Sequence, residues 1–266
     1  MELQSDLQHA IEFEQLELHY QPVVRLDGHR ILGVEALLRW QHPTRGMVSP
    51  AQFIPLAEDT GLIIPIGRWV LETACAEGVR LQQKFSRTEP LTMSVNLSVR
   101  QLQSDSIVAD VRAALEKTGL PAKSLVLEIT ESVMMADTEF AVRRLDDLKS
   151  LGVRLAMDDF GTGYSSLSYL SRFPVDILKM DRSFVGAGEN VALQSAIIAL
   201  GASLELDVVA EGIELPEQEQ SLHDLGCEIG QGFLFARPMP SSDLAAFLAG
   251  RPEWSDADLD ATTNAA

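Results

Sequence analysis

Residues 125–159 read LVLEITESVMMADTEFAVRRLDDLKSLGVRLAMDD, and this stretch contains a strand, a helix and a second strand. Leu125 to Thr130 is a short apolar run of strand length, and Thr138 to Leu151 has apolar residues at the i, i+3 and i+4 spacing of a helix. Gly152 provides helix-stop chemistry before the next apolar run, Val153 to Met157. A strand, a helix and a strand in this order predict two parallel strands joined by a crossover helix.

The same alternation extends in both directions from this stretch. Further helical patterns occur at Leu62 to Phe85, Ile107 to Thr118, Leu193 to Leu204 and Gln218 to Leu225, and a lead-in helix is expected over residues 1–15. The eight strand candidates are Leu16 to Val24, Ile31 to Leu38, Leu91 to Leu97, Leu125 to Thr130, Val153 to Met157, Ile177 to Met180, Asp207 to Ala210 and Cys227 to Ile229. Eight such units predict an α/β fold of the TIM type, a closed (βα)8 barrel.

The connection between the first two strands differs from the others. Only Arg25 to Arg30 joins them, with Asp27-Gly28 inside, which is hairpin length and hairpin chemistry. A parallel crossover needs a dozen or more residues, so the first strand is predicted to be antiparallel. An open doubly wound sheet is the alternative architecture. No glycine-rich phosphate loop follows the first strand, and this weakens the alternative.

Composition limits the classes of function. The chain has 266 residues with 46% hydrophobic side chains, enough for one large core, and its net charge of −18 disfavours sequence-independent binding to a DNA or RNA duplex. The polar, acidic start has no signal-peptide pattern and no apolar run reaches membrane-spanning length, so a cytoplasmic location without direct membrane contact is expected. The alternative is that the chain is the cytoplasmic part of a larger, membrane-anchored protein. Cys75 and Cys227 are expected to be buried free thiols, and residues 251–266 a disordered acidic tail after a domain of residues 1–250.

Polar side chains stand at the carboxyl ends of seven consecutive strands, from the second to the eighth. In a TIM barrel these ends face the active site. The residues are Glu35, Arg39, Asn96, Glu128, Glu131, Asp158, Asp159, Lys179, Asp181, Glu211, Glu214 and Gln231. Converging carboxylates repel one another unless they are protonated, paired or neutralised by cations. Carboxylate and amide oxygens without a cysteine cluster or a histidine pair suit Mg²⁺ or Mn²⁺, and two such ions suit phosphodiester hydrolysis.

Each residue taken alone has a plainer interpretation. Glu35 could form a buried ion pair with Arg39, and Asn96 could cap the following helical turn. The run from Asp158 to Gly163 could be a turn rich in aspartate and glycine. The combination on seven successive strands at matching depth favours a metal site instead.

The motifs in their order resemble the EAL domain family of bacterial cyclic di-GMP phosphodiesterases. The resemblance spans residues 20–233. It rests on Tyr20-Gln21-Pro22, Glu35-Ala36-Leu37-Leu38-Arg39-Trp40, Asn96-Leu97-Ser98, Glu128-Ile129-Thr130-Glu131, Asp158-Asp159-Phe160-Gly161-Thr162-Gly163-Tyr164-Ser165-Ser166, Lys179-Met180-Asp181, Ala210-Glu211-Gly212-Ile213-Glu214 and Gln231-Gly232-Phe233.

The resemblance implies a role for each of these side chains. Two Mg²⁺ or Mn²⁺ ions would be held by Glu35, Asn96, Glu128, Asp158, Asp159 and Glu211, with Lys179 positioning the water nucleophile and Glu35 essential for turnover. Glu211 would act as general base or as a metal ligand. Gln21, Arg39 and Gln231 would contact the dinucleotide. Glu131 would hold the loop that begins at Asp158, and Glu214 would support the inner site through hydrogen bonds.

The implied activity is hydrolysis of cyclic di-GMP to linear pGpG. Many relatives have lost catalytic acids and act only as receptors, so a catalytically silent binding module is the alternative; no acid, amide or lysine of the motifs is missing here. A barrel enzyme with a carboxylate–Mg²⁺–Lys site and other chemistry is a third possibility. The resemblance further implies a homodimer, and an upstream sensory or cyclase domain is a common companion in the family.

Overall fold

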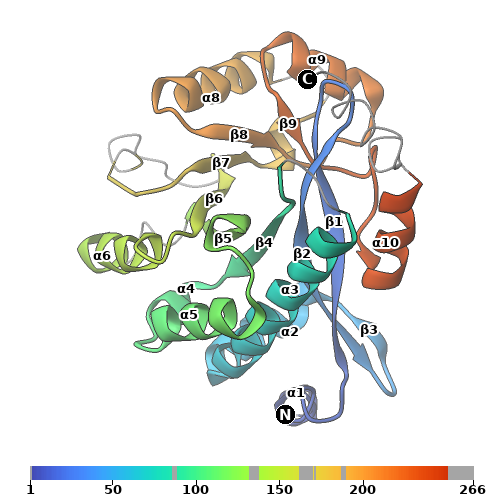
Figure 1. Cartoon of the computed structure of the whole chain (residues 1–266), viewed down its shortest axis with the longest axis vertical. Helices are drawn as coiled ribbons and strands as arrows, with labels where there is room; N and C mark the ends of the chain where they lie inside the picture. The colour runs from blue at the N-terminus through green and yellow to red at the C-terminus, as the bar shows by residue number, and fades with distance from the viewer. Residues whose placement is uncertain are drawn as a thin grey trace, which may run out of the picture.

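The computed structural model describes residues 2–85, 89–131, 138–161, 170, 172–186 and 190–250, and eight of its strands close into a barrel surrounded by helices (Figure 1). The strands are β1 Leu16–Arg25, β2 Ile31–His42, β3 Gly46–Val48, β4 Thr92–Leu97, β5 Leu125–Thr130, β6 Arg154–Phe160, β7 Ile177–Met180, β8 Asp207–Ala210, β9 Ile229–Gly230 and β10 Met239–Pro240. The helices are α1 Glu2–Gln8, α2 Pro50–Thr60, α3 Ile63–Lys84, α4 Val99–Leu102, α5 Ile107–Thr118, α6 Thr138–Lys149, α8 Val191–Ser203, α9 Pro216–Asp224 and α10 Ser241–Ala249, with short 3₁₀ turns η1 Ala122–Ser124 and η3 Arg182–Phe184.

The first strand is antiparallel to both of its neighbours in the ring, as predicted. β1 pairs with β2 from Leu16↔Trp40 to Val24↔Ile31, and its end pairs with β9. The turn between β1 and β2 contains Gly28 at φ +75°, a left-handed conformation that suits glycine. β2, β4, β5, β6, β7, β8 and β9 then pair in parallel in this order. Because β1 joins both ends of this series, the barrel is closed and the open-sheet alternative is wrong.

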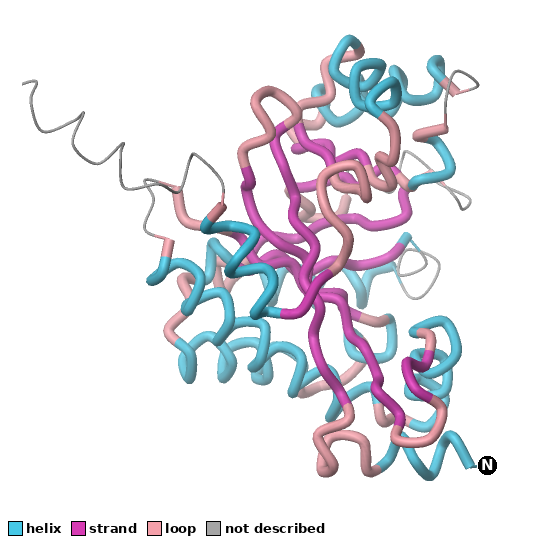
Figure 2. The backbone as a smooth tube through the Cα atoms, turned by 90° about the vertical axis from the view of Figure 1, so that its right-hand side faces the viewer, coloured by secondary structure: helices cyan, strands magenta, loops and turns pink. Residues whose placement is uncertain are grey.

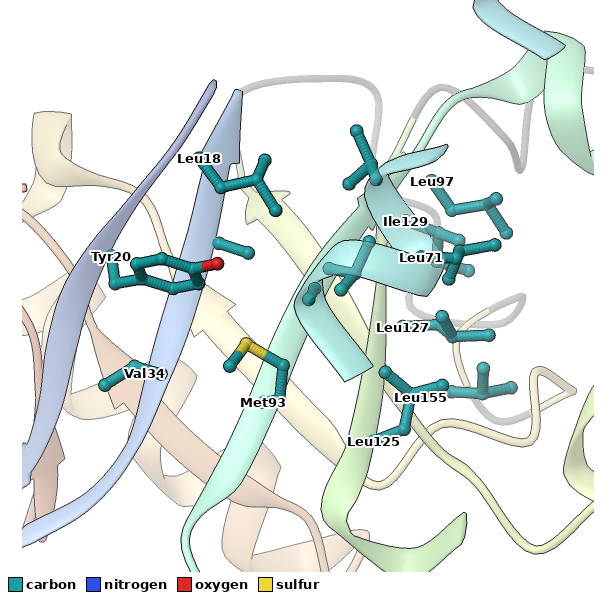
Figure 3. Packing of buried hydrophobic residues seen from close by; sticks show 14 of the residues in the cluster. Leu18, Tyr20, Val34, Leu71, Met93, Leu97, Leu125, Leu127, Ile129 and Leu155 are labelled. Carbon is teal, nitrogen blue, oxygen red and sulfur yellow. The ribbon is translucent and has the colours of Figure 1, made fainter. Parts of the chain in front are cut away.

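Alternation along each parallel strand separates a helix-facing side from a lumen-facing side. Leu125, Leu127 and Ile129 of β5 are fully buried and lie on the same side of the wall as Leu71 of α3 (Figure 3). The residues between them, such as Glu128, therefore point into the barrel. This period of two is what places polar residues of several strands inside one ring.

Several elements were not predicted from the sequence. β3 extends the β1–β2 hairpin beyond the ring, towards α1 (Figure 2), and α2 precedes α3. β10 pairs with β1, and α10 follows it. The expected helix over residues 1–15 is shorter, since α1 ends at Gln8 and turns follow it.

The remaining fold expectations have mixed outcomes. Cys75 and Cys227 are free and buried, as expected. No helix within the described part of the chain is long and apolar enough to cross a membrane. The expected tail over residues 251–266 lies outside the described residues, as do residues 162–166 of the loop after Asp159.

Candidate metal centre

The ring brings the predicted polar residues to one end because parallel strands place their carboxyl ends on the same rim. Register fixes the neighbours: Gln21 faces Glu35 across β1 and β2, and Asn96 faces Glu128 across β4 and β5. Thr130 faces Asp158 across the next pair of strands. Glu211 directly follows β8, and Gln231 directly follows β9. Figure 1 shows these strands converging from different parts of the chain.

A bulge in β6 gives the site two adjacent carboxylates. Met157 pairs with Leu178 and Phe160 pairs with Met180, so Asp158 and Asp159 together lie opposite the single residue Lys179. Asp159 has φ +53°, a left-handed value that aspartate tolerates better than most residues. In a regular strand these two side chains would point to opposite faces. The bulge instead brings carboxylate oxygens of Asp158, Asp159 and Glu211 within 4.8 Å of one another.

Lys179 is the cation at the centre of the carboxylates. Its Nζ donates to Oε2 of Glu128 at 2.5 Å and lies 2.6 Å from Oε1 of Glu211. Oδ1 of Asp158 is 3.2 Å away and Oε2 of Glu35 is 3.8 Å away. The Lys179 side chain is only 3% exposed, so this is a buried ion cluster with four acids around one base.

The amide side chains form a second group around Glu35. Asn96 Nδ2 donates to Oε1 of Glu35 at 2.7 Å, and Gln231 Nε2 donates to Oε2 of Glu35 at 2.8 Å. The Gln231 amide also donates to Oε1 of Gln21, and Nε2 of Gln21 donates to the carbonyl of Ala236. Glu35 thus accepts hydrogen bonds at both oxygens, and its orientation is fixed before any ligand arrives.

Crowding of the acids changes their protonation. Burial is the largest cause that raises the pKa of Glu211, which reaches about 8. Lys179 acts to lower this pKa, whereas repulsion from neighbouring carboxylates acts to raise it. The same causes raise the pKa of Glu128 well above its usual range. Burial acts to lower the pKa of Lys179, but Glu128, Glu211 and the other carboxylates outweigh it and raise that pKa. The metal-free cluster therefore retains protons at neutral pH.

These residues fit a divalent metal. Oδ1 of Asp158 is buried and accepts no hydrogen bond, although it lies near Lys179. An unsatisfied buried carboxylate oxygen is costly, and a hard cation would satisfy it. The donor set of five carboxylates and the Asn96 amide consists of oxygen ligands, which favours Mg²⁺ or Mn²⁺ over softer metals. Asn96 is exposed, so the cluster is open on its side.

Two of the sequence-predicted residues make hydrogen bonds with segments that follow the strand ends. Oε2 of Glu131 accepts a 3.2 Å hydrogen bond from the backbone N–H of Gly161, which fixes the start of the segment after Asp159. Glu214 is exposed, and its backbone N–H donates to Oε1 of Gln218 at the beginning of α9. A direct role of Glu214 in the inner site stays a prediction.

A groove adjoins the cluster, and sequence reasoning identified only part of it. Its volume is about 820 Å³, and it lies between the end of β2, α2, α3 and α4. Arg39 and Asn96 line it, as do Asp59 and apolar side chains that include Ile63 and Ile66. Asp59 belongs to α2, which was not predicted, so no signal in the strand pattern pointed to it.

Phe233 is a further rim residue whose role the sequence did not reveal. Its ring is 44% exposed, and the Arg237 guanidinium stacks 4.2 Å from the ring centroid. The ring quadrupole attracts the guanidinium, so this contact holds the two side chains together at the surface. The cation–π pair links residues four apart in the segment after β9, and that spacing alone is too common to be a signal.

Comparison with known proteins gives one consistent result. The family model described as EAL domain matches residues 4–238. Among curated proteins, the Pseudomonas aeruginosa proteins MucR, a "bifunctional diguanylate cyclase/cyclic di-GMP phosphodiesterase", and NbdA, a "cyclic di-GMP phosphodiesterase", are 46% and 43% identical over 94% and 93% of this chain. These matches cover 37% and 32% of the two proteins, so the chain spans about a third of their length. A structure titled as the MucR phosphodiesterase in complex with cyclic di-GMP superposes with a TM-score of 0.87 at 46% identity, covering 92% of this chain and 100% of that one.

Proposed function

The chain belongs to the EAL domain family, and on that premise we propose that it is a metal-dependent phosphodiesterase that hydrolyses cyclic di-GMP to linear pGpG. The observation that carries the proposal is the bulge at Asp158 and Asp159, which turns two adjacent carboxylates towards Glu211. The relatives MucR and NbdA are named as cyclic di-GMP phosphodiesterases, and this supports the choice of substrate. The intact set of Glu35, Asn96 and Lys179 supports catalysis rather than binding alone.

The residues around the cluster have complementary tasks in this reaction. Glu35, Asn96, Glu128, Asp158, Asp159 and Glu211 would hold two divalent cations. When bound, these cations lower the pKa of water and neutralise charge that develops on the phosphate. Lys179 donates hydrogen bonds from the centre of the cluster and orients the attacking water. Glu211 takes the proton of that water, or serves as a ligand while another base does so.

The bond changes are those of phosphodiester hydrolysis. The water oxygen forms a bond to phosphorus, and the bond from phosphorus to the 3′ oxygen of one ribose breaks. That oxygen gains a proton, so the ring opens to a linear dinucleotide with one 5′ phosphate and one free 3′ hydroxyl. Lys179, held by carboxylates on several sides, is placed to stabilise negative charge during the attack.

The groove beside the cluster supports a purine dinucleotide as the substrate. Its apolar wall at Ile63 and Ile66 suits the face of a guanine base, and the Asp59 carboxylate can accept hydrogen bonds from the guanine N–H groups. Arg39 lies between groove and cluster, where its guanidinium can bind a phosphate. We therefore propose that one guanylate half lies in the groove while a phosphate reaches the cluster at Asn96. Gln21 and Gln231 would contact the dinucleotide from the opposite side of Glu35.

The setting of this activity is also a proposal. We propose a cytoplasmic enzyme that works as a homodimer with two Mg²⁺ or Mn²⁺ ions per site. We also propose that a sensory or cyclase domain can precede it in a longer chain. The described residues alone do not require a partner chain to complete the carboxylate cluster. Light scattering with and without cyclic di-GMP tests the dimer.

The decisive experiment is turnover by the purified chain. With Mn²⁺ or Mg²⁺, the product should be pGpG, and Ca²⁺ should inhibit because it takes more ligands and a looser geometry. Glu35→Ala should abolish turnover, whereas Glu217→Gln on the exposed face of α9 should leave it unchanged. Tight binding of cyclic di-GMP with no turnover under any divalent ion would favour the receptor alternative. Neither binding nor turnover would point to a different barrel chemistry.

A further inference from the structure

The lower part of the barrel is not filled by side chains. A cavity of about 250 Å³ runs from the amino-terminal face of the parallel strands towards the centre of the ring. Its inner end reaches Glu128 and Lys179, which belong to the acidic cluster. The substrate groove lies at the other end of the strands, where Asn96 and Thr130 line it. TIM barrels usually fill this region with layers of bulky residues. The chain instead has a connection between the floor of the barrel and its charged centre.

Small side chains at two lumen positions, Ser94 and Ala156, account for the open space between larger ones. Ser94 of β4 lines the cavity, together with Val126, Ile177 and Val209. Ala156 packs in the same lumen cluster and adds little volume. A longer side chain at Ser94 or Ala156 would occupy the space, so the cavity follows from the side chains that the sequence places there.

The chemistry of the cavity favours water as its occupant. Hydroxyl groups of Ser94 and Thr92 and the polar atoms of Glu128 and Lys179 offer the two to four partners that buried water needs. The volume has room for about eight water molecules at ~30 Å³ each. An apolar ligand would leave these polar groups unsatisfied.

The mouth of the cavity is lined by charged side chains whose positive and negative charges cancel. Three arginines and three acids line it as ion pairs. The pairs are Arg25–Glu228 at 2.7 Å, Arg30–Glu89 at 3.0 Å and Arg154–Asp207 at 2.5 Å. Because each guanidinium already has a carboxylate partner, the mouth offers no uncompensated charge to retain a phosphate or a metal ion. A neutral, polar occupant fits this mouth best.

We propose that this cavity is a water-filled shaft through which solvent reaches the buried Lys179–Glu128 pair from the face opposite the substrate groove. The shaft keeps that pair in contact with water when a ligand covers the carboxyl-terminal rim. This inference rests on lumen packing and is independent of the proposed activity.

Cysteine accessibility tests the shaft directly. Ser94→Cys places a thiol in the shaft, and Val95→Cys places one on the helix-facing side of the same strand, where Val95 is 1% exposed. Neutral methyl methanethiosulfonate should modify Ser94→Cys at least about tenfold faster than Val95→Cys, which needs local unfolding to react. The unmodified chain gives the background, since Cys75 and Cys227 are buried. Equal rates for the two variants would overturn the shaft.

Two further measurements keep the result unambiguous. Covering the groove with cyclic di-GMP and Ca²⁺, with binding verified by calorimetry, should leave the Ser94→Cys rate unchanged, and protection would show entry from the groove instead. Failure of cyclic di-GMP to bind would contradict the proposed function but would leave the comparison of Ser94→Cys with Val95→Cys intact. A high-resolution crystal structure of the unmodified chain should show ordered water between Ser94 and Lys179, and an empty cavity there would overturn the proposal even if either variant failed to fold.

Discussion

The Nζ of Lys179 lies 2.6 Å from Oε1 of Glu211, and this contact joins a buried ammonium to a carboxylate whose pKa is raised to about 8. Lys179 serves two purposes at this position. In the metal-free protein it neutralises acids that would otherwise repel one another. In the proposed hydrolysis it would supply hydrogen bonds to the reacting water. The two purposes can be separated experimentally, because divalent metal can replace the first but not the second.

Lys179→Met should therefore destabilise the metal-free domain and abolish most activity. Removing one partner of a buried ion cluster costs about 3–5 kcal/mol of the free energy of unfolding, whereas turnover should fall at least ~100-fold through loss of water positioning. Mn²⁺ should restore most of the stability without restoring turnover. The measurements are urea denaturation with and without Mn²⁺ and the initial rate of hydrolysis.

The matched control is Lys149→Met. Lys149 lies 2.6 Å from Asp176 in a partly exposed pair, so its loss should cost about 1 kcal/mol or less. Equal destabilisation by the two substitutions would contradict the central role of Lys179.

Metal affinity should rise with pH, and the contribution of Glu211 to that rise should end above about pH 8. The metal-free site binds protons because the pKa of Glu211 is raised to about 8 and that of Glu128 is raised as well. Metal requires the deprotonated carboxylates, so below pH 8 each cation displaces protons, and affinity gains about tenfold per pH unit for each proton released. Above pH 8 Glu211 is already ionised and its contribution to this dependence ends. Calorimetric titration of Mn²⁺ at pH 6.5 and at pH 9 in buffers of different ionisation enthalpy measures the proton release.

The stability of the metal-free domain should change in the opposite direction. A carboxyl whose folded-state pKa exceeds its unfolded value favours the folded state less as the pH rises from the unfolded pKa to the folded one. Glu211 therefore makes the metal-free domain progressively less stable between about pH 4.5 and 8, and the raised pKa of Glu128 acts in the same direction. Bound metal removes this loss. Stability that is the same at pH 5.5 and pH 8 in the chelated protein would contradict the raised pKa values. Glu217→Gln, an exposed change on α9, should leave the profile unaltered.

Arg39→Ala should raise KM with little change in kcat. Arg39 lines the groove and is held by a 2.9 Å hydrogen bond from Nη1 to the carbonyl of Leu38, near the cluster but outside it. A lost charge-assisted contact costs about 1.5–3 kcal/mol, which is roughly a 10- to 150-fold increase in KM. Initial rates over a range of cyclic di-GMP concentrations separate the two constants. Arg112→Ala, on the exposed side of α5, is the control, and a large fall in kcat for Arg39→Ala would place the guanidinium at the reacting phosphate instead.

The alternation of strands and helices was readable from the sequence because buried parallel strands are short apolar runs bounded by helix-stop residues. The antiparallel β1 was readable as well, since six residues from Arg25 to Arg30 allow a hairpin and exclude a crossover. Polar residues such as Glu128 and Lys179 within apolar runs identified the lumen side of their strands. Local rules sufficed for these features because each depends on a few adjacent residues.

Other features depend on contacts that no local pattern encodes. The bulge at Asp158 and Asp159 is visible only against the register of β7, and the sequence alone suggested a turn there as readily. β10 is two residues long and exists because β1 offers an open edge. That Asp59 and Arg39 line the same groove follows from the packing of α2 next to the end of β2. The open floor of the barrel likewise depends on how Ser94 and its neighbours fit together across the lumen.

Gly232→Ala should disturb the site through the backbone that carries Gln231. A Cβ at position 232 would lie 2.0 Å from the carbonyl oxygen of Ile213 and 2.4 Å from its nitrogen. Those backbone groups are already hydrogen-bonded, since the N–H of Ile213 donates to Gln231 and the carbonyl of Ile213 accepts from Leu234. The clash can be relieved only by moving one of the two segments, and Gln231 moves with it.

The expected cost is at least about 1–3 kcal/mol of unfolding free energy, as for other overpacked sites, with a fall in turnover because the Gln231 hydrogen bond to Glu35 lengthens. Gly186→Ala is the matched control, because a Cβ there has no heavy atom within 4 Å. Denaturation curves and hydrolysis rates of the two variants are compared side by side. If Gly232→Ala were as stable and as active as Gly186→Ala, the segment after Gln231 would have room to yield, and Glu35 would owe its orientation mainly to Asn96 rather than to the Gln231 amide.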